Sequence, residues 1–489
     1  MFHPERPLTA AGPRRRVFSV FHPEITVPSK LLTEKQAEKL LQVSRTTLWR
    51  LRAEGGIPHV NVGGQVRYER KDLQAWIARQ KADAPTPDDA PLALDECRSA
   101  GEEAWCSAIG EQDWGFHDEA TNELTHALHP YPAKFPPPLP RRLVEILTRP
   151  GDTVLDPFCG SGTTLVEALR LDRATVGTDI NPVGVLVSEA KTLALAAGAR
   201  DQILALQRTV QADADREGDE ASLIARTVEP VDPSPAPAIP NIANWFEPIA
   251  IRELGIAVRR IGTLDDAARV VARAALSSIL VQVSNQDSET RYTARPRGLK
   301  PGEVLSRLAR RLGDVASMHS EWGPQRGSRA CRVLLADART LTRRTTGHIH
   351  AVVTSPPYAN AFDYHLYHRH RMFWLGHDPG VVRDLEIGSH LNHQREKDGV
   401  ASYRDDMAAS IRALSKVLRP GAPCAFVVGD SVFHGATVNN ARVIAQAGRE
   451  AGFRCVAVAE RAIHPIKRSM IGPARRARIE RVVLLVRSA

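Results

Sequence analysis

The stretch Thr153-Val-Leu-Asp-Pro-Phe-Cys-Gly-Ser-Gly-Thr-Thr-Leu-Val-Glu-Ala-Leu169 decides the fold of most of this chain. Residues 153–155 indicate a short, largely apolar strand, and the segment 156–162 is a glycine-rich turn. The segment 163–169 has the apolar spacing of an amphipathic helix. A strand, a glycine turn and a helix in this order form the ligand-binding edge of an open α/β sheet. Because Thr163 rather than lysine follows the last glycine, the turn is not a Walker loop for a nucleoside triphosphate.

A second apolar segment, Ala174-Thr-Val-Gly-Thr-Asp179, indicates the neighbouring strand. It ends in a carboxylate about twenty residues after the turn, a position suited to binding two ribose hydroxyls. Dinucleotide-binding proteins share this feature, but the turn lacks their regular spacing of three glycines. The pattern therefore favours a ligand that contains ribose but is not a dinucleotide.

The nine residues Asp156-Pro-Phe-Cys-Gly-Ser-Gly-Thr-Thr164 resemble motif I of the DNA amino-methyltransferases, which bind S-adenosylmethionine. Upstream, His129-Pro-Tyr-Pro-Ala-Lys-Phe135 resembles motif X of the same family, and Cys331-Arg-Val-Leu-Leu-Ala-Asp337 looks like its third strand. Without the family, Tyr131 and Phe135 could equally be aromatic residues of the hydrophobic core. Asp179 and Asp337 could equally cap loops at the ends of strands. The resemblance implies a cofactor site made of Tyr131, Lys134, Phe135, Asp156, Phe158, Gly160, Gly162, Thr163, Asp179 and Asp337.

A further apolar strand, residues 350–354, runs directly into Ser355-Pro-Pro-Tyr358. Two consecutive prolines fix the backbone at a strand end, so the flanking polar groups project in defined directions. Ser355 Oγ and the Pro356 carbonyl could accept the two N–H bonds of a nucleobase amine and aim its lone pair at a methyl group. Tyr358 would stack on a base flipped out of the duplex.

The tetrapeptide Ser355-Pro356-Pro357-Tyr358 matches motif IV of the family, in which serine is usual for cytosine-N4 enzymes and Asp or Asn for adenine-N6 enzymes. The resemblance therefore favours cytosine N4. Cytosine-C5 transfer would need a nucleophilic cysteine, but Cys424 opens a later strand and reads as a buried core thiol.

Neither a metal site nor a disulfide framework is indicated. His365, His368 and His370 lie close together, but no carboxylate or cysteine at convincing spacing completes a tetrahedral set, so we expect a core or groove-lining role. The six cysteines are scattered without a Cys-x-x-Cys pair, and the N-terminal residues lack a secretory signal pattern. We expect a reducing cytoplasm.

The segment 29–81 has its own pattern of short elements. Thr33-Glu-Lys-Gln36 is a capping box that opens one helix, and Ser44 can cap a second helix over residues 45–54. A small hairpin with a Gly-Gly turn follows, and Asp72 is expected to cap a last helix.

This segment resembles the excisionase-like winged helix-turn-helix domains through Leu41-x-Val-Ser-Arg45-x-Thr-Leu48, Gly56-Ile-Pro58 and Asp72-Leu-x-x-Trp76. In such domains the second helix enters the major groove and the wing follows the backbone. The alternative is a protein-docking module with solvated arginines. The resemblance implies double-stranded DNA as a partner, with Arg45, Thr46, Thr47 and Arg50 near base edges and Arg67 near phosphate.

The expected organisation is a flexible arm over 1–28, the winged helix-turn-helix over 29–81, an acidic, proline-punctuated linker over 82–104 and a methyltransferase domain over 105–489. The expected fold is α/β, a seven-stranded Rossmann-like class I methyltransferase with a helical insertion, plus the small N-terminal domain. The insertion, 195–329, is either a target-recognition subdomain or a structural cap on the sheet.

The 489 residues carry a formal net charge of +9, with no apolar run near the roughly 20 residues of a membrane helix. Residues 30–81 carry +6, 291–344 carry +9 and 454–481 carry +6, whereas 82–103 carry −6. These basic segments fit contacts with the phosphates of a nucleic acid.

The favoured function is transfer of a methyl group from S-adenosylmethionine to cytosine N4 in DNA at a specific site. Three alternatives stay open: adenine-N6 transfer, an RNA guanine-N2 enzyme and a non-catalytic DNA-binding regulator. The sequence also leaves open whether a restriction nuclease or another defence component is a partner.

Overall fold

The computed structural model describes residues 31–41, 43–53, 57–81, 92–116, 119–219, 237–289, 291–359, 363–389, 399–433, 436–462 and 479–488. The chain divides into two compact units, one within Met1–Thr86 and the other within Pro87–Ala489. The expected arm over 1–28 lies outside the described residues.

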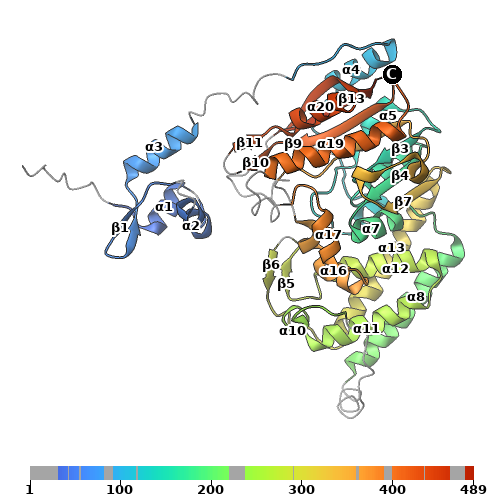
Figure 1. The fold of residues 1–489 in the computed structure, drawn as a ribbon. Helices are drawn as coiled ribbons and strands as arrows, with labels where there is room; N and C mark the ends of the chain where they lie inside the picture. The colour runs from blue at the N-terminus through green and yellow to red at the C-terminus, as the bar shows by residue number, and fades with distance from the viewer. Residues whose placement is uncertain are drawn as a thin grey trace, which may run out of the picture. The chain divides into compact units, whose positions relative to one another are not determined.

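Short helices and a hairpin build the smaller unit (Figure 1). The capping box is confirmed, because the Thr33 N–H donates to Gln36 Oε1 at 2.9 Å and the Gln36 N–H donates to Thr33 Oγ1 at 3.3 Å. Ser44 caps the second helix by accepting from the Thr47 N–H at 3.2 Å. The elements are α1 (Glu34–Leu41), α2 (Arg45–Ala53), β1 (Val60–Val62), β2 (Gln65–Arg67) and α3 (Arg70–Lys81).

One small apolar core holds these elements together. Leu32 pairs with Tyr68 through an antiparallel bridge, which ties the start of the unit to the end of the hairpin. The prediction that Asp72 caps the last helix was wrong, because α3 begins at Arg70. Asp72 lies in the first turn of α3, where its carboxylate interacts favourably with the helix dipole. The buried apolar residues are Leu32, Ala37, Leu48, Ile57, Tyr68 and Leu73.

A seven-stranded mixed sheet forms the centre of the larger unit, in the order β12-β13-β9-β8-β3-β4-β7. The five strands β9, β8, β3, β4 and β7 are parallel, and β13 lies antiparallel to both β9 and β12. This mixed sheet fits the Rossmann-like fold that was expected. The strands are β3 (Thr153–Asp156), β4 (Ala174–Asp179), β7 (Cys331–Leu335), β8 (Ala351–Thr354), β9 (Pro423–Gly429), β12 (Phe453–Ala462) and β13 (Ile479–Arg487).

Both faces of the sheet are covered, as the near-continuous apolar strands require. Leu155 and Val352 pack in one hydrophobic cluster, whereas their neighbours Val154 and Val353 pack in another on the opposite face. The helices and 3₁₀ turns outside the insertion are α4 (Ala100–Glu111), η2 (Leu124–Leu128), α5 (Pro138–Leu147), α6 (Thr163–Arg170), α7 (Pro182–Thr192), η3 (Ala338–Thr340), α14 (Arg343–Thr346), α15 (Tyr364–Tyr367), α16 (Arg369–Trp374), α17 (Pro379–Leu385), α19 (Gly399–Val417) and α20 (Asn440–Glu450). A separate hairpin, β10 (Ser431–Phe433) with β11 (Ala436–Val438), follows β9.

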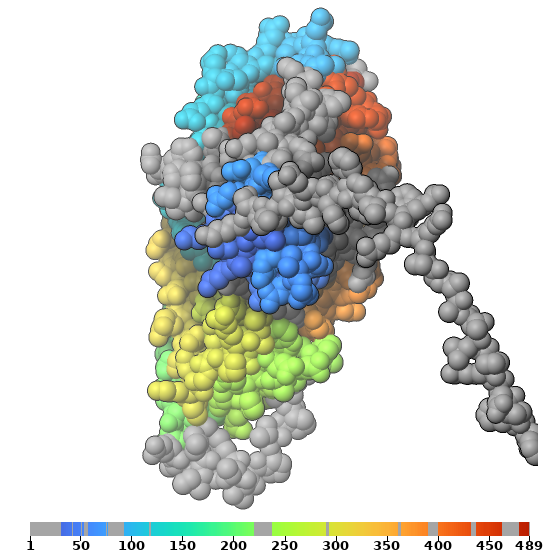
Figure 2. All heavy atoms as spheres, turned by 90° about the vertical axis from the view of Figure 1, so that its left-hand side faces the viewer, coloured from blue at the N-terminus to red at the C-terminus, as the bar shows by residue number. Residues whose placement is uncertain are grey.

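The insertion is mainly helical and lies below the sheet in Figure 1, and its green and yellow atoms appear in the lower half of Figure 2. Its apolar residues share one cluster with Val187 of α7 and with Met372 and Trp374 of α16, so it packs on the sheet domain. A short hairpin, β5 with β6, also belongs to the insertion, and Ser284 and Gln286 are buried there. The elements are α8 (Ala197–Gly218), α10 (Ile242–Trp245), α11 (Pro248–Gly262), α12 (Asp266–Ile279), β5 (Gln286–Ser288), β6 (Arg291–Ala294) and α13 (Glu303–Gln325).

The described C-terminal part of the expected linker belongs to the larger unit. Asp95 accepts a hydrogen bond from the Cys455 N–H at 2.7 Å, and buried Glu102 forms a bidentate ion pair with Arg454, at 2.6 and 2.9 Å. Charge composition alone indicated a solvated tether, but these carboxylates have partners on β12. The boundary expected at residue 105 was therefore wrong, since α4 begins at Ala100.

Among the described helices, none alone is long and apolar enough to cross a membrane. The successive helices α7 and α8 pass that test of length and composition only together, as a pair bent by 117°.

Candidate cofactor and catalytic site

The glycine turn, Asp179 and Ser355 lie at the carboxyl ends of three parallel strands, β3, β4 and β8. The chain adds β4 and β7 on one side of β3 and then crosses to add β8 and β9 on the other side. The strand order therefore reverses between β3 and β8, and in open α/β sheets ligands bind in the crevice at such a switch point. The glycine turn follows β3, and Ser355 follows β8.

The glycine turn packs so closely on α7 that a side chain would not fit. Gly162 has φ of +75°, and a Cβ placed on it would lie 2.9 Å from the Ser188 Cα and 2.8 Å from its Oγ. Directly after it, Thr163 begins α6 with a buried Oγ1 that has no hydrogen-bond partner among the described residues. An unsatisfied hydroxyl at a helix N-terminus fits a polar or anionic ligand group.

Two aspartates flank this turn, and burial raises the pKa of each to about 6. Asp179, at the end of β4, accepts from the Gly160 N–H and from the Asn181 N–H, both at 2.8 Å. Each of its oxygens keeps a further lone pair, so ribose hydroxyls could bind there. Asp156, at the end of β3, accepts from the Thr354 hydroxyl at 2.6 Å.

The loop before the first strand reaches the glycine turn through Tyr131. A Cβ on Gly160 would lie 3.6 Å from the Tyr131 ring, and that ring also stacks on Tyr364, with centroids 6.1 Å apart. Lys134 instead donates to Asn122 Oδ1 and to the His126 carbonyl. Phe135 packs on a hydrophobic cluster under the sheet, which is the core role that the sequence left open.

Asp337 occupies the expected place after β7 but is committed to protein donors. It caps η3 by accepting from the Arg339 N–H at 2.9 Å, and the Arg339 guanidinium binds both of its oxygens. The same guanidinium reaches Asp406 Oδ1 at 2.7 Å. The geometry therefore favours the loop-capping alternative for Asp337, and a contact with adenine stays a prediction.

Phe158, within the turn, is half-buried against the cluster that contains Leu155. Its N–H donates to Asp156 Oδ1 at 3.1 Å, which fixes the first bend of the turn.

The tetrapeptide Ser355-Pro-Pro-Tyr358 is held by hydrogen bonds with two other elements, α19 and β13. The Pro357 carbonyl accepts from the buried Tyr403 hydroxyl of α19 at 3.1 Å. The Ser355 hydroxyl lies 3.5 Å from the Tyr358 hydroxyl, which donates to Glu480 Oε1 of β13 at 3.1 Å. Pro356 is buried.

Thr354 and Glu480 are contributors that the sequence did not identify. Thr354 joins the catalytic strand to the glycine turn through Asp156. The sequence could have indicated Thr354, because it is a hydroxyl-bearing residue at the end of an apolar strand. Glu480 had no comparable signal, because its position depends on the antiparallel direction of β13.

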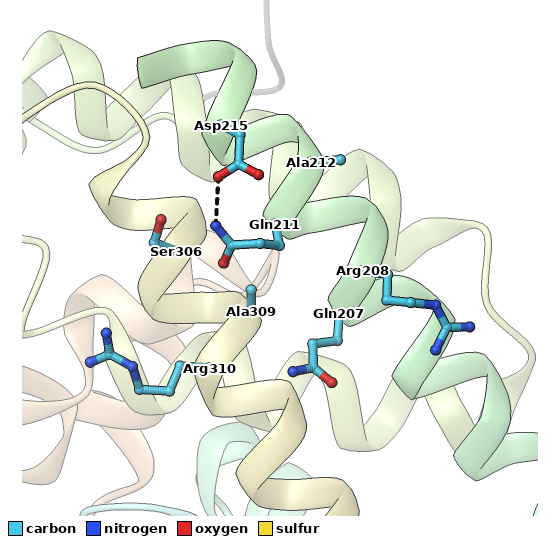
Figure 3. A pocket seen from close by; sticks show the side chains of 8 residues that line it. All are labelled: Gln207, Arg208, Gln211, Ala212, Asp215, Ser306, Ala309 and Arg310. Carbon is cyan, nitrogen blue, oxygen red and sulfur yellow. Dashed lines mark hydrogen bonds between the residues drawn. The ribbon is translucent and has the colours of Figure 1, made fainter. Parts of the chain in front are cut away.

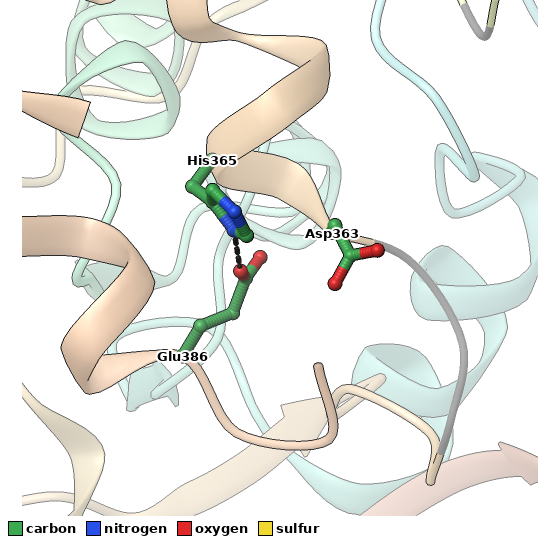
Figure 4. A group of neighbouring side chains, drawn as sticks. All are labelled: Asp363, His365 and Glu386. Atoms are coloured by element: carbon green, nitrogen blue, oxygen red, sulfur yellow. Dashed lines mark hydrogen bonds and ion pairs between the residues drawn. The ribbon is translucent and has the colours of Figure 1, made fainter. Parts of the chain in front are cut away.

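Asp363, His365 and Glu386 offer ligand atoms within 4.8 Å of one another (Figure 4). His365 Nδ1 lies 2.5 Å from Glu386 Oε2, while Glu386 Oε1 accepts from the Tyr364 N–H at 2.6 Å. Asp363 accepts from the Ser389 hydroxyl at 2.7 Å. These contacts hold α15 against the end of α17. Separately, Cys424 is fully buried in β9 and burial raises the pKa of its thiol, in agreement with a core role.

In the smaller unit, the predicted DNA-binding residues lie on α2 and β2. Arg45 and Thr46 are exposed, whereas the Thr47 hydroxyl lies 2.9 Å from Ser44 Oγ within the cap. Arg67 donates to the Val66 carbonyl at 2.9 Å. The backbone of Arg50 belongs to α2, but its side chain lies outside the described residues.

A surface hollow of about 570 Å³ lies between α8 and α13 of the insertion (Figure 3). Within it, Gln211 donates to Asp215 at 2.8 Å. Since both elements belong to the insertion, the hollow is separate from the site at the carboxyl edge. Its lining residues are Gln207, Arg208, Gln211, Ala212, Asp215, Ser306, Ala309 and Arg310.

Residues 33–189 match the family model described as DNA methylase. The chain is 43% identical over 81 residues to the Type II methyltransferase M.MvaI of Kocuria varians, covering 16% of this chain and 18% of that protein. It is 41% identical over 93 residues to M.MjaII of Methanocaldococcus jannaschii, covering 18% of each chain. It is 40% identical over 86 residues to M.BglI of Bacillus subtilis, covering 18% of this chain and 23% of that protein. The chain thus spans about a fifth of the length of the curated relatives it matches.

Solved structures give weaker likenesses. The rRNA methyltransferase aviRa of Streptomyces viridochromogenes aligns over 78% of this chain and 96% of its own, at 15% identity and a TM-score of 0.27. TrmN of Thermus thermophilus aligns over 72% of this chain and 49% of its own, at 14% identity and a TM-score of 0.26. The sequence matches support an amino-methyltransferase of the N4/N6 DNA methylase kind, for which S-adenosylmethionine is the implied cofactor.

Proposed function

We propose that this chain methylates the exocyclic N4 amine of cytosine in double-stranded DNA with S-adenosylmethionine as the methyl donor. One observation carries the proposal: the Ser355-Pro-Pro-Tyr358 motif and the glycine turn lie on adjacent strands and are joined by the Thr354–Asp156 hydrogen bond. A methyl donor on the turn and an amine at Ser355 would therefore meet in one crevice.

The residues around the turn fit the proposed donor. We assign Asp179, which accepts from the Gly160 N–H, to the ribose hydroxyls, and the unsatisfied Thr163 hydroxyl to the polar amino-acid end. Tyr131 and Phe158 supply aromatic surface near the turn. When bound, S-adenosylmethionine supplies an electrophilic sulfonium methyl group.

The tetrapeptide is suited to orient a weak nucleophile. The lone pair of a nucleobase amine is delocalised into the ring, so hydrogen bonds from its N–H groups to fixed acceptors favour the geometry needed for attack. Ser355 Oγ and the Pro356 carbonyl are the acceptors we assign. Tyr358 would stack on the flipped cytosine.

The smaller unit is proposed as a winged helix-turn-helix DNA-binding domain. The support is the order of helix, helix, hairpin and helix around one core, with Arg45 and Thr46 exposed on the second helix. The three relatives named above carry the printed description Type II methyltransferase, and we propose a restriction nuclease as the functional partner of this chain.

The test is to incubate the purified chain with unmethylated genomic DNA and labelled S-adenosylmethionine, digest the DNA to nucleosides and identify the product by mass spectrometry. We expect N4-methylcytosine. N6-methyladenine would contradict the choice of base, and labelling of RNA alone would contradict the choice of nucleic acid. Absence of transfer to any nucleic acid would favour a non-catalytic regulator.

A further inference from the structure

Glu480 fixes the direction of the hydrogen bonds at the catalytic tetrapeptide. An ionised carboxylate only accepts, so the 3.1 Å contact between Tyr358 and Glu480 Oε1 commits the Tyr358 proton to Glu480. The Tyr358 oxygen is then an acceptor for the Ser355 hydroxyl, 3.5 Å away. A serine that donates toward Tyr358 keeps its own lone pairs for another donor.

An arginine on the neighbouring strand β12 forms an ion pair with Glu480. Arg461 of β12 is the cross-strand partner of Glu480 and forms an ion pair with its second oxygen, Oε2. Arg461 also donates to the Trp114 carbonyl at 2.9 Å, which holds the guanidinium in place. The two side chains are only 10% and 17% exposed. Pairing of this kind compensates a largely buried carboxylate for the loss of its contacts with water.

The topology of the sheet explains why a residue 122 positions away reaches the catalytic motif. Because β13 is antiparallel to β9, its first residues lie at the carboxyl edge, where Glu480 is opposite Gly429. A parallel last strand would put its first residues at the other edge of the sheet.

We propose that Glu480 is a positioning residue for methyl transfer. Through Tyr358 it orients the Ser355 hydroxyl so that Ser355 Oγ presents a lone pair to the N–H of the target amine. Arg461 holds Glu480 in this position. The inference rests on the proposed function and adds to it a polar chain that runs from the last strand to the reacting amine.

The first test is Glu480→Gln, which keeps the size of the side chain and removes its charge. We expect kcat with unmethylated DNA to fall at least tenfold, with the affinity for S-adenosylmethionine changed less than threefold. The matched control is Glu460→Gln on β12, because Glu460 is 60% exposed and pairs with Arg481. This control should keep wild-type kcat. Thermal unfolding of each variant checks that the fold is intact.

The second test asks whether Glu480 acts through Tyr358. Tyr358→Phe keeps a ring for stacking and removes the hydroxyl, so Glu480 should have nothing left to orient. The double variant should then be about as slow as Tyr358→Phe alone, since residues in one chain of contacts give non-additive losses.

Wild-type kcat in Glu480→Gln, or losses that multiply in the double variant, would overturn the positioning role and leave the proposed function standing. A lower affinity for S-adenosylmethionine with unchanged kcat would also overturn it, because the residue would then act on the cofactor. Absence of transfer by the unaltered chain would instead overturn the proposed function, and this inference with it.

Discussion

Ser355 and Asp179 carry the two chemical tasks that we propose for the site, orientation of an amine and binding of a ribose. Ser355 lies at the end of β8 and Asp179 at the end of β4, two strands away across β3. Asp179 accepts a hydrogen bond from the Gly160 N–H, 19 residues earlier, whereas Ser355 lies beside Tyr358, three residues later in the same motif. Substitution of these two residues therefore tests the proposed chemistry most directly.

Ser355→Ala should lower kcat by roughly a hundredfold, the usual cost of removing one fixed hydrogen-bonding group at a reacting centre. The affinity for S-adenosylmethionine should stay nearly unchanged, because Asp179 and the glycine turn are intact. Single-turnover kinetics and calorimetric titration with the cofactor measure the two quantities. A large loss of cofactor affinity would contradict the role assigned to Ser355.

Cofactor affinity should depend on pH through Asp179. Burial raises its pKa to about 6, so lowering the pH through 6 protonates the group and removes the charge that attracts ribose hydroxyls. If only the ionised form binds, affinity should fall by about tenfold between pH 7 and pH 5. Calorimetric titration across this range is the measurement, and Asp179→Asn should bind weakly with a flatter profile. A steep profile in that variant would assign the titration to another group, such as Asp156.

The raised pKa of Asp179 also makes the stability of the fold depend on pH. A carboxyl group with a pKa above its unfolded value stabilises the fold below about pH 4, and this contribution is lost as the pH rises through 6. The charged form needed for the ligand is thus the less stable form of the empty site.

At the scale of elements, the segment 92–111 determines where the larger unit begins. It contains α4 and is held on β12 by Asp95 and by the buried ion pair of Glu102 with Arg454. An acidic sequence with prolines is typical of a linker, but here the acidic groups meet complementary charges from residues about 350 positions later.

Glu102→Ala should destabilise the larger unit by about 3 kcal/mol, because Arg454 would remain buried without its charge partner. Urea denaturation of the purified chain measures this. The matched control is Glu103→Ala, since Glu103 is exposed on the same turn of α4 and its loss should cost less than about 0.5 kcal/mol. Equal effects of the two substitutions would show that the ion pair contributes little.

The ion pair should also respond to acid. Contact with Arg454 lowers the pKa of Glu102, so its contribution to stability is present above the ordinary pKa of glutamate and is lost as the pH falls. The difference between wild type and Glu102→Ala should therefore shrink in acid.

At the scale of the whole molecule, the chain combines a small unit with its own core and a larger unit that contains the candidate site. The sheet, the insertion and segment 92–111 share contacts within the larger unit. The proposed DNA recognition and the proposed methyl transfer therefore fall in different units and can be tested independently.

Deletion of residues 1–82 should leave the candidate methyltransferase site folded and able to bind S-adenosylmethionine. Affinity for duplex DNA should fall by at least tenfold, and the salt dependence of binding should become less steep as phosphate contacts are lost. Fluorescence anisotropy with labelled duplexes at several salt concentrations measures both. Unchanged DNA affinity would favour a protein-docking role for the smaller unit.

The local pattern of the sequence determined most individual elements. The turn from Asp156 to Gly162, the capping box at Thr33 and the apolar strands follow from neighbours in the chain, and these predictions were confirmed. Such features depend on backbone propensity and on hydrogen bonds over a few residues, which a single sequence displays. The role of the Ser-Pro-Pro-Tyr motif and the DNA-binding function of α2 stay predictions.

The tertiary structure alone decided which distant groups meet. Asp337 forms an ion pair with Arg339, and Glu102 forms one with Arg454. Glu480 accepts a hydrogen bond from Tyr358, which is 122 residues away in the sequence. A charged residue shows its charge in the sequence but not its partner, because pairing depends on the order and direction of strands. The sequence by itself therefore determined the elements and the candidate chemistry, whereas the packing of the sheet decided which polar groups are free to act.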